Sequence, residues 1–187
     1  VDGDEECNPF YDDYMSKLVK CSCCGLVVHP VCYGIEELPP GQNTWFCTGC
    51  SVGLCARDLG CQLCTHVGGA LQPTIKNGMW IHVSCGYLVP EVMCFDPDKR
   101  NPWSLRLLNK KRYTLQCSFP GCKFKNKKST SPEKVTYTTF YSGDIAKSNQ
   151  DGNVCVQCVQ YGCFQAVHPR CALLPESGFE FLEDGPT

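Results

Sequence analysis

Closely spaced cysteine pairs are the feature of this sequence that most limits how the chain can fold. The chain has 18 Cys in 187 residues, a density typical of disulfide-linked secreted domains and of metal-rich domains. C-x2-C pairs recur, and His-x2-Cys pairs follow them at residues 29–32, 82–85 and 168–171. Thiolate and imidazole at these intervals suit tetrahedral Zn²⁺, because one tight turn presents two ligands side by side. The spacing therefore predicts zinc sites, and with them a reducing compartment.

The pairs form three clusters, and nothing in the sequence indicates secretion or a membrane span. The first residues, VDGDEEC, are acidic, and no apolar run reaches the length of a spanning helix. Each cluster is too short to bury an adequate apolar core, so zinc must supply folding free energy. We expect a small zinc-stabilised α+β fold with little regular secondary structure. The predicted ligands are Cys7, Cys21, Cys24, His29, Cys32, Cys47 and Cys50 in the first cluster, Cys61, Cys64, His82 and Cys85 in the second, and Cys117, Cys122, Cys158, Cys163, His168 and Cys171 in the third.

The order of pairs in the first cluster predicts a cross-brace, in which alternate pairs share one ion. A His-Cys pair stands between two C-x2-C pairs, whereas a sequential finger takes its ligands four at a time. The cysteines at 21, 24, 47 and 50 would then hold one ion. His29 and Cys32 would hold another, together with an N-terminal pair. A RING finger is also cross-braced, but it usually has a Cys-x-His pair, which the first cluster lacks.

This order, with Trp45 two residues before the last pair, resembles a PHD finger. "CQLCTHVGGALQPT" and "WIHVSC" resemble the zinc knuckle of PHD–knuckle–extended-PHD cassettes, and "CVQC" with "GCFQAVHPRC" resembles the extended PHD finger. Such cassettes occur in chromatin regulators, and these strings are most similar to the version in JmjC-type histone demethylases. The resemblance implies a PHD finger at 1–53, a C2HC knuckle at 54–98 and an extended PHD finger at 99–187 with an insertion near 123–153. It also implies about four or five structural Zn²⁺ ions.

Both ends depart from the family pattern, and four cysteines are left over. The N-terminal pair is either Cys7 with a further ligand or a pair before Val1, and we favour Cys7. The extended finger needs one more ligand pair, expected after Phe181, so the sequence reads as a piece of a larger protein. The cysteines left over are Cys23, Cys55, Cys94 and Cys155. Cys155 could replace a ligand, but Cys163 precedes His168 by five residues, as Cys24 precedes His29, which favours Cys158 and Cys163.

The predicted sites are structural rather than catalytic. Each zinc has four protein ligands once the ends are complete, whereas catalysis needs an open coordination position. The chain has no H-E-x-x-H motif, no glycine-rich phosphate loop and no His-x-Asp iron motif of the kind a demethylase needs. We therefore expect a non-catalytic binding module, even where the parent protein is an enzyme.

Uneven charge indicates what the module binds. The net charge is −2, yet residues 1–13 hold six acids and no base, and residues 99–134 hold eleven bases and one acid. Either run alone is also typical of a solvated loop. Together they fit chromatin, where basic histone tails lie beside DNA phosphates, and predict a nuclear protein.

The resemblance implies that the first finger receives the histone H3 tail as an added strand. The strand would lie beside the segment before the third cysteine, and carbonyls near the "LPPG" turn would hold the tail's free amine. Acidic side chains favour an unmodified lysine at the tail's fourth position. A partial aromatic cage from Tyr11, Tyr14 and Met15 keeps methyl-lysine binding open. The predicted tail-binding residues are Asp2, Asp4, Glu5, Glu6, Leu18, Val19, Lys20, Pro40 and Gly41.

The basic run predicts weak, sequence-tolerant binding of duplex DNA through phosphate contacts. The residues concerned are Lys110, Lys111, Arg112, Lys123, Lys125, Lys127 and Lys128. A nuclear-localisation signal and an acidic partner surface are rival interpretations of the same run. Two functions of other classes also stay open: a RING-like scaffold of an E3 ubiquitin ligase, and an architectural module that braces neighbouring domains.

Overall fold

The computed structural model describes residues 16–41, 44–64, 66–122 and 154–180. Its sheets are four antiparallel hairpins of two strands each. They pair β1 (Val19–Lys20) with β2 (Val27–Val28), β3 (Leu71–Pro73) with β4 (Trp80–His82), β5 (Met93–Cys94) with β6 (Trp103–Ser104), and β7 (Val156–Gln157) with β8 (Ala166–Val167). The helices are α2 (Pro30–Tyr33), α3 (Thr48–Ser51), α4 (Val83–Leu88), α5 (Pro169–Ala172) and two 3₁₀ turns, η1 (Lys110–Thr114) and η3 (Pro175–Ser177). These short elements confirm the predicted α+β fold with little regular structure.

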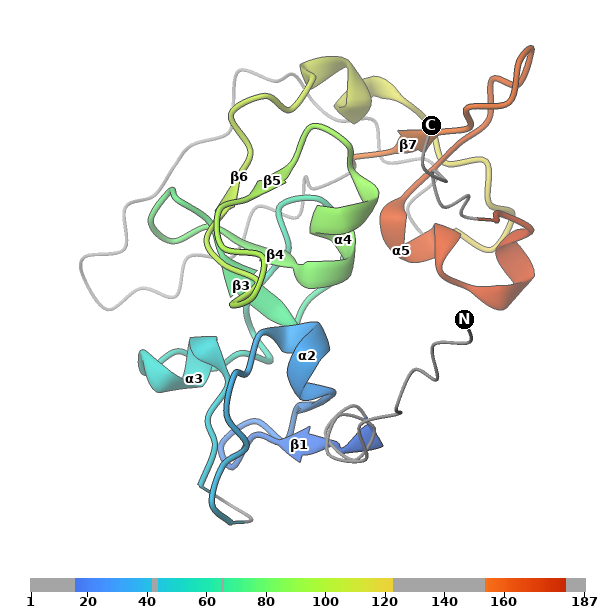
Figure 1. The fold of residues 1–187 in the computed structure, drawn as a ribbon. Helices are drawn as coiled ribbons and strands as arrows, with labels where there is room; N and C mark the ends of the chain where they lie inside the picture. Colours follow the sequence, from blue (N-terminus) through green and yellow to red (C-terminus); the bar gives the residue numbers. More distant parts are fainter. Residues whose placement is uncertain (1–15, 42–43, 65, 123–153, 181–187) are drawn as a thin grey trace, which may run out of the picture.

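Three modules follow one another along the chain (Figure 1). We call them the first finger (16–53), the knuckle (54–108) and the second finger (109–122 with 154–180). The predicted boundary after residue 98 falls inside the β5–β6 hairpin, whose strands pair Met93 with Ser104. Leu105 and Leu108 also pack on the core that the knuckle shares with the first finger. We therefore propose to place this boundary after Leu108.

Every His-x2-Cys pair adopts the same local structure. His29, His82 and His168 each occupy the N-cap of a short helix in extended conformation, and the cysteine three residues later lies inside that helix. In two of the three, proline occupies the first helical position, where its missing N–H costs nothing. A strand therefore feeds directly into a helix, and the turn between them sets the histidine beside the cysteine.

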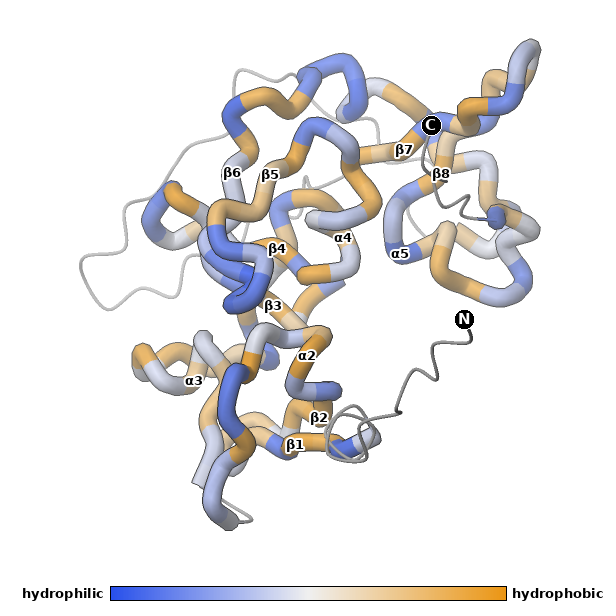
Figure 2. Tube along the Cα trace, viewed as in Figure 1, coloured by the Kyte–Doolittle hydropathy of each residue, from blue (hydrophilic) through white to orange (hydrophobic). Residues whose placement is uncertain are grey.

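The first finger and the knuckle share one core, which Val154 of the second finger also joins, and the second finger has a further core of its own. Leu63, Leu71, Ile81 and Trp103 are fully buried in the shared core. A separate group around Cys155 and Val167 fills the second finger. Hydrophobic stretches recur along β3 and β4 in the middle of the molecule, with hydrophilic loops around them (Figure 2). Among the described residues, no helix is long and apolar enough to cross a membrane.

A buried polar network joins the first finger to the knuckle. The side-chain amide of Gln72, which is 1% exposed, donates to the carbonyl of Tyr33 at 2.7 Å. The Gln72 Oε1 atom accepts from the hydroxyl of Thr48 at 2.8 Å. The Tyr33 hydroxyl donates to the carbonyl of Leu71 at 2.8 Å and accepts from the Thr48 N–H at 3.2 Å. Because every buried group in this network has a partner, the two modules are held in one arrangement.

The β5–β6 loop makes a second contact between the same modules. Arg100 Nε donates to the carbonyl of Val31 at 3.3 Å, and its guanidinium lies over the Tyr87 ring, 5.4 Å from the centroid. Gly34 ends α2 with φ +81°, and a Cβ built there would lie 2.2 Å from the carbonyl of Lys99. Only glycine fits this turn, because it supplies both the left-handed backbone and the close approach.

Candidate metal centres

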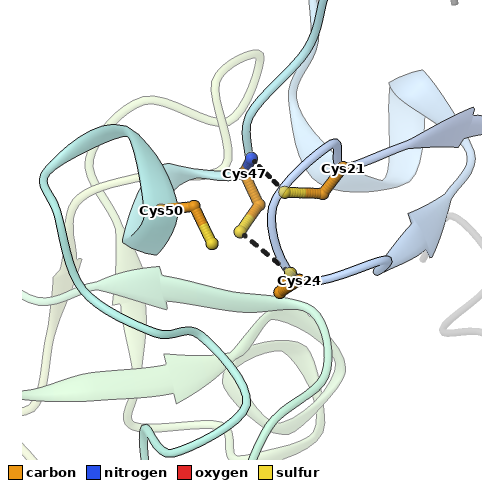
Figure 3. Close-up of side chains that lie close together, drawn as sticks. All are labelled: Cys21, Cys24, Cys47 and Cys50. Atoms are coloured by element: carbon orange, nitrogen blue, oxygen red, sulfur yellow. Dashed lines mark hydrogen bonds between the residues drawn. The ribbon is translucent and has the colours of Figure 1, made fainter. Parts of the chain in front are cut away.

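Four cysteines meet in the first finger (Figure 3). Cys21 and Cys24 come from the turn after β1, and Cys47 and Cys50 come from the N-terminal end of α3. Their sulfur atoms all lie within 4.8 Å of one another. The Cys24 and Cys47 sulfurs are 3.7 Å apart, and the Cys47 N–H donates to the Cys21 sulfur at 3.3 Å. Four converging sulfurs suit one tetrahedral ion, and they are the four that the cross-brace groups together.

The knuckle brings together Cys61, Cys64, His82 and Cys85, all of them buried, with ligand atoms within 4.8 Å. His82 Nδ1 lies 3.3 Å from the Cys64 sulfur and 3.7 Å from the Cys85 sulfur. Its other ring nitrogen, Nε2, lies 2.7 Å from the Gly68 carbonyl, to which it donates when Nδ1 is the metal ligand. Such an outer hydrogen bond fixes the tautomer and the ring orientation of a metal-binding histidine.

The second finger forms a similar site from Cys117, Cys122, His168 and Cys171. His168 Nδ1 is 3.4 Å from the Cys122 sulfur and 3.7 Å from the Cys171 sulfur. In this finger the first and third pairs meet, whereas in the first finger the second and fourth pairs meet. The two fingers therefore display complementary halves of one cross-brace.

The donor chemistry of all three sites fits zinc. In the knuckle, burial lowers the pKa of the His82 imidazole, but the adjacent thiols of Cys61 and Cys64 raise it more, to about 10. The same two thiols, together with burial, raise the pKa of the Cys85 thiol far above its ordinary value. Ionising several thiols together in one buried site is thus costly without a cation between them. A divalent ion with soft ligands relieves this cost, and zinc is the structural cofactor expected here.

Two further predicted pairs lie apart from these clusters. His29 and Cys32 are exposed, and no third metal ligand approaches them within the described ranges. Cys158 and Cys163 flank the turn between β7 and β8, and the described residues offer them no partner pair either. Cys7 lies outside the described residues, as does the segment after Phe181 in which the last pair was expected. These assignments remain proposals.

The four leftover cysteines have three different environments. Cys23 and Cys55 are exposed beside the first-finger site. Cys94 donates from its thiol to the Asp96 carbonyl at 3.2 Å. Cys155 is fully buried, its thiol faces the Leu115 carbonyl at 3.6 Å, and burial raises its pKa to about 12. A buried thiol of this kind packs like a small apolar side chain.

The predicted DNA-binding residues separate in the structure. Lys110 and Lys111 are exposed on η1. Arg112 instead points inward, and its Nε donates to both carboxylate oxygens of Glu91, at 2.8 and 2.7 Å. The two side chains are only 18% and 26% exposed. This position argues against our interpretation of Arg112 as a phosphate contact, because Glu91 already pairs with its charge. Lys123, Lys125, Lys127 and Lys128 lie outside the described residues.

Three residues that support the metal sites were missed by sequence reasoning. The Gly68 carbonyl orients His82, as described above. Gly69 follows with φ +91°, and a Cβ built there would lie 3.3 Å from Nε2 of His82, a tight contact. Arg57 donates from Nε to the Cys24 carbonyl at 2.7 Å, which braces the turn that carries two ligands. The "GG" pair was a visible signal for a tight turn, but nothing near Arg57 in sequence points to Cys24.

Comparison with known proteins shows which family has this arrangement of zinc-finger modules. The sequence profile described as a PHD-zinc-finger like domain matches residues 59–183, more than half of the chain. The chain belongs to this family. A second profile, described as a PHD-finger, matches residues 15–51 of the same PHD-type chain. The predicted PHD–knuckle–extended-PHD resemblance is thus confirmed, whereas the likeness to the demethylase version stays a prediction.

Several relatives share this PHD-type region. Protein Jade-1 of Danio rerio is 30% identical over 84% of this chain, E3 ubiquitin-protein ligase Jade-2 of Homo sapiens is 32% identical over 84%, and Protein AF-17 of Homo sapiens is 32% identical over 83%. The chain spans only 15%, 16% and 12% of their lengths. The crystal structure of zebrafish PHF14-PZP matches with a TM-score of 0.55 and 27% identity, over 83% of this chain and 65% of that one.

Proposed function

We propose that this chain is a non-catalytic chromatin reader that binds the N-terminal tail of histone H3 as a strand added to β1. The observation that carries the proposal is the unpaired outer edge of β1. Within the described residues, β1 pairs with β2 alone, in the register Val19 to Val28. The backbone groups of Leu18 and Lys20 point away from β2, and no described residue bonds to them. An extended peptide satisfies such an edge through its main chain.

The turn near Pro40 and Gly41 is suited to hold the tail's amine. Both residues are exposed, and nothing lies within 4 Å of a Cβ built on Gly41. The Gly41 carbonyl accepts from the Thr44 hydroxyl at 2.7 Å, which fixes the direction of this acceptor. A protonated amine gains most from a preformed carbonyl acceptor, since a charged donor makes the stronger hydrogen bond.

An unmodified lysine at the fourth tail position is the favoured partner. Val27, two residues before His29, is 49% exposed and occupies the place where a methyl-lysine cage usually has a tryptophan. The acidic residues Asp2, Asp4, Glu5 and Glu6 and the candidate cage residues Tyr11, Tyr14 and Met15 lie outside the described residues. The proposal for an ammonium partner therefore rests on the missing tryptophan and on the charge of residues 1–13.

Titration of the chain with a short H3 peptide tests this function. A free amine and an unmodified fourth lysine should give a micromolar dissociation constant, about 8 kcal/mol of binding free energy. The amides of Leu18, Val19 and Lys20 should shift in nuclear magnetic resonance spectra. Acetylation of the peptide amine should remove binding, because the carbonyl acceptors lose their charged donor. Tighter binding of the trimethyl-lysine peptide would contradict the ammonium preference and favour the methyl-lysine reader.

Duplex DNA is proposed as a second, weaker partner, and the nucleus as the location where both partners occur. Lys110 and Lys111 are exposed on η1, and neither is engaged in a salt bridge within the described chain. Two bases on one short turn attract phosphates but read no sequence. Weak binding with a strong salt dependence is therefore expected.

A ubiquitin-ligase function is the alternative with a specific observation behind it, since one relative is named E3 ubiquitin-protein ligase Jade-2. The chain covers 16% of that protein, so the name gives no role to this region. A ubiquitin-transfer assay with purified conjugating enzymes tests the alternative directly. Transfer that depends on the first-finger cysteines would replace the reader proposal. An inert chain that also binds no peptide would favour a purely architectural module.

A further inference from the structure

Both fingers contain the same hairpin, so their outer edges can be compared residue by residue. The pairing of Val19 with Val28 in the first finger corresponds to that of Val156 with Val167 in the second. The next ladder bond is also equivalent: the Cys21 N–H donates to Leu26 at 2.8 Å and the Cys158 N–H donates to Gln165 at 2.9 Å. In an antiparallel ladder, the residues between bonded pairs turn their backbone groups outward.

The outward residues in the second finger are Cys155 and Gln157, and Cys155 is already occupied. Its N–H donates to the Arg112 carbonyl at 3.2 Å. Its own carbonyl accepts from Arg112 Nη1, also at 3.2 Å. One residue, Arg112, thus takes both outward backbone groups of Cys155, at the start of the β7 edge. The Cys155 thiol faces the Leu115 carbonyl, so the chain just after η1 also contacts this residue.

Arg112 is itself held from the other side. The bifurcated bond of its Nε to both carboxylate oxygens of Glu91 anchors it to the knuckle, in a half-buried position. A strand entering at Cys155 would have to break two hydrogen bonds and separate this ion pair. Because a partly buried carboxylate without its partner is costly, the closed arrangement is favoured. The equivalent position in the first finger, Leu18, is 60% exposed and meets no such residue in the described chain.

We propose that Arg112 closes the β7 edge of the second finger to added strands, so that each chain takes one extended tail, at β1. The identity of that tail rests on the proposed function, but the closure does not. Arg112 then occupies the place on the β7 edge that a peptide strand would take. Its positive charge pairs with Glu91 and does not contact DNA.

Amide exchange of the intact zinc-loaded chain tests the closure without any peptide. The Cys155 amide should be protected in the wild type. In Arg112→Gln it should exchange about tenfold faster or more, because this variant keeps the backbone carbonyl at position 112 but loses the guanidinium that holds the residue against Cys155. Lys111→Gln is the matched control, since it removes a neighbouring exposed charge and should leave exchange unchanged. If Arg112→Gln loses zinc, the same exchange measurement is made on Glu91→Gln. That variant keeps Arg112 and removes the carboxylate charge that anchors its guanidinium. An unprotected Cys155 amide in the wild type would overturn the proposal that Arg112 closes the β7 edge. Equal exchange rates in Arg112→Gln and Lys111→Gln would also overturn it.

The H3 peptide titration then separates the two proposals. One tail per chain predicts shifts at Leu18–Lys20 and none at Val156 or Gln157 over the same concentrations. Equal shifts on both edges would refute the closure while leaving the reader function intact. If neither the β1 edge nor the β7 edge shows shifts, the proposed histone-binding function is wrong. The exchange data would still decide whether Arg112 closes the β7 edge.

Discussion

Gly86 faces the indole of Trp103, and this contact sets how closely α4 approaches the β5–β6 hairpin. A Cβ built on Gly86 would lie 2.6 Å from Cζ3 of Trp103, and Trp103 is 1% exposed. Tyr87 meets the same indole edge-on, with ring centroids 5.1 Å apart. The indole N–H donates to the Arg100 carbonyl at 2.6 Å, which fixes the ring from its far end. The tryptophan therefore has no free direction in which to move.

Gly86→Ala should destabilise the knuckle by about 1–3 kcal/mol, the usual cost of overpacking a rigid core. Thermal unfolding of the zinc-loaded chain measures the loss. Gly41→Ala is the control, because a Cβ there meets nothing within 4 Å and its backbone is not left-handed. Equal melting temperatures for the two variants would show that Trp103 can retreat after all.

Contacts between residues that are distant in sequence could not be predicted from the sequence, whereas local ligand spacing could. The thiols at 21, 24, 47 and 50 could be grouped in advance, because C-x2-C spacing lets one turn present two ligands. Arg112 could not be assigned correctly, since the sequence shows only a basic run and its partner Glu91 lies 21 residues away. Gln72 gave no signal either, because its partners Tyr33 and Thr48 belong to another module.

Among the elements, the strand–histidine–helix unit is what makes metal binding and folding inseparable. In the knuckle, β4 ends at His82, and α4 begins with the next residue and contains Cys85. A helix of six residues is not stable by itself in water. A metal ion bound by the ligand set would hold its first turn against β4. Local spacing predicted these ligands, whereas the boundary after 108 depends on strand pairing that the sequence does not show.

Cys64→Ala or His82→Ala should unfold the knuckle and release one zinc ion, because metal binding there supplies folding free energy. Native mass spectrometry should count at least about four ions in the wild type and one fewer in either variant. Cys94→Ser is the matched control, since this cysteine lies outside the metal clusters of the described chain. Loss of zinc in the control, or its retention in Cys64→Ala, would contradict the ligand assignment.

For the whole molecule, the separation of charges predicts two partners that bind independently. Replacing Lys110 and Lys111 by Glu should weaken duplex DNA binding strongly and leave H3 peptide affinity nearly unchanged. Wild-type affinity should fall with salt at a slope of about −0.9 per phosphate contacted. Arg112 stays unaltered in this variant, because its replacement would disturb the β7 edge. Electrophoretic shift assays over a salt series measure the effect, and unchanged DNA affinity would show that η1 is only a solvated surface.

The buried network of Gln72, Tyr33 and Thr48 also has a consequence for avidity. Flexible linkers between binding modules dilute the second contact over many orientations, whereas a fixed connection keeps it within a narrow range. In this chain a satisfied polar network fixes the first finger on the knuckle, and the Arg112–Glu91 pair fixes the turn that carries Lys110 and Lys111. When a histone tail is bound at β1, DNA attached to the same complex would therefore reach η1 at an effective concentration set by this fixed geometry. Simultaneous binding of a tail and a duplex that belong to one complex would then depend on the distance between them.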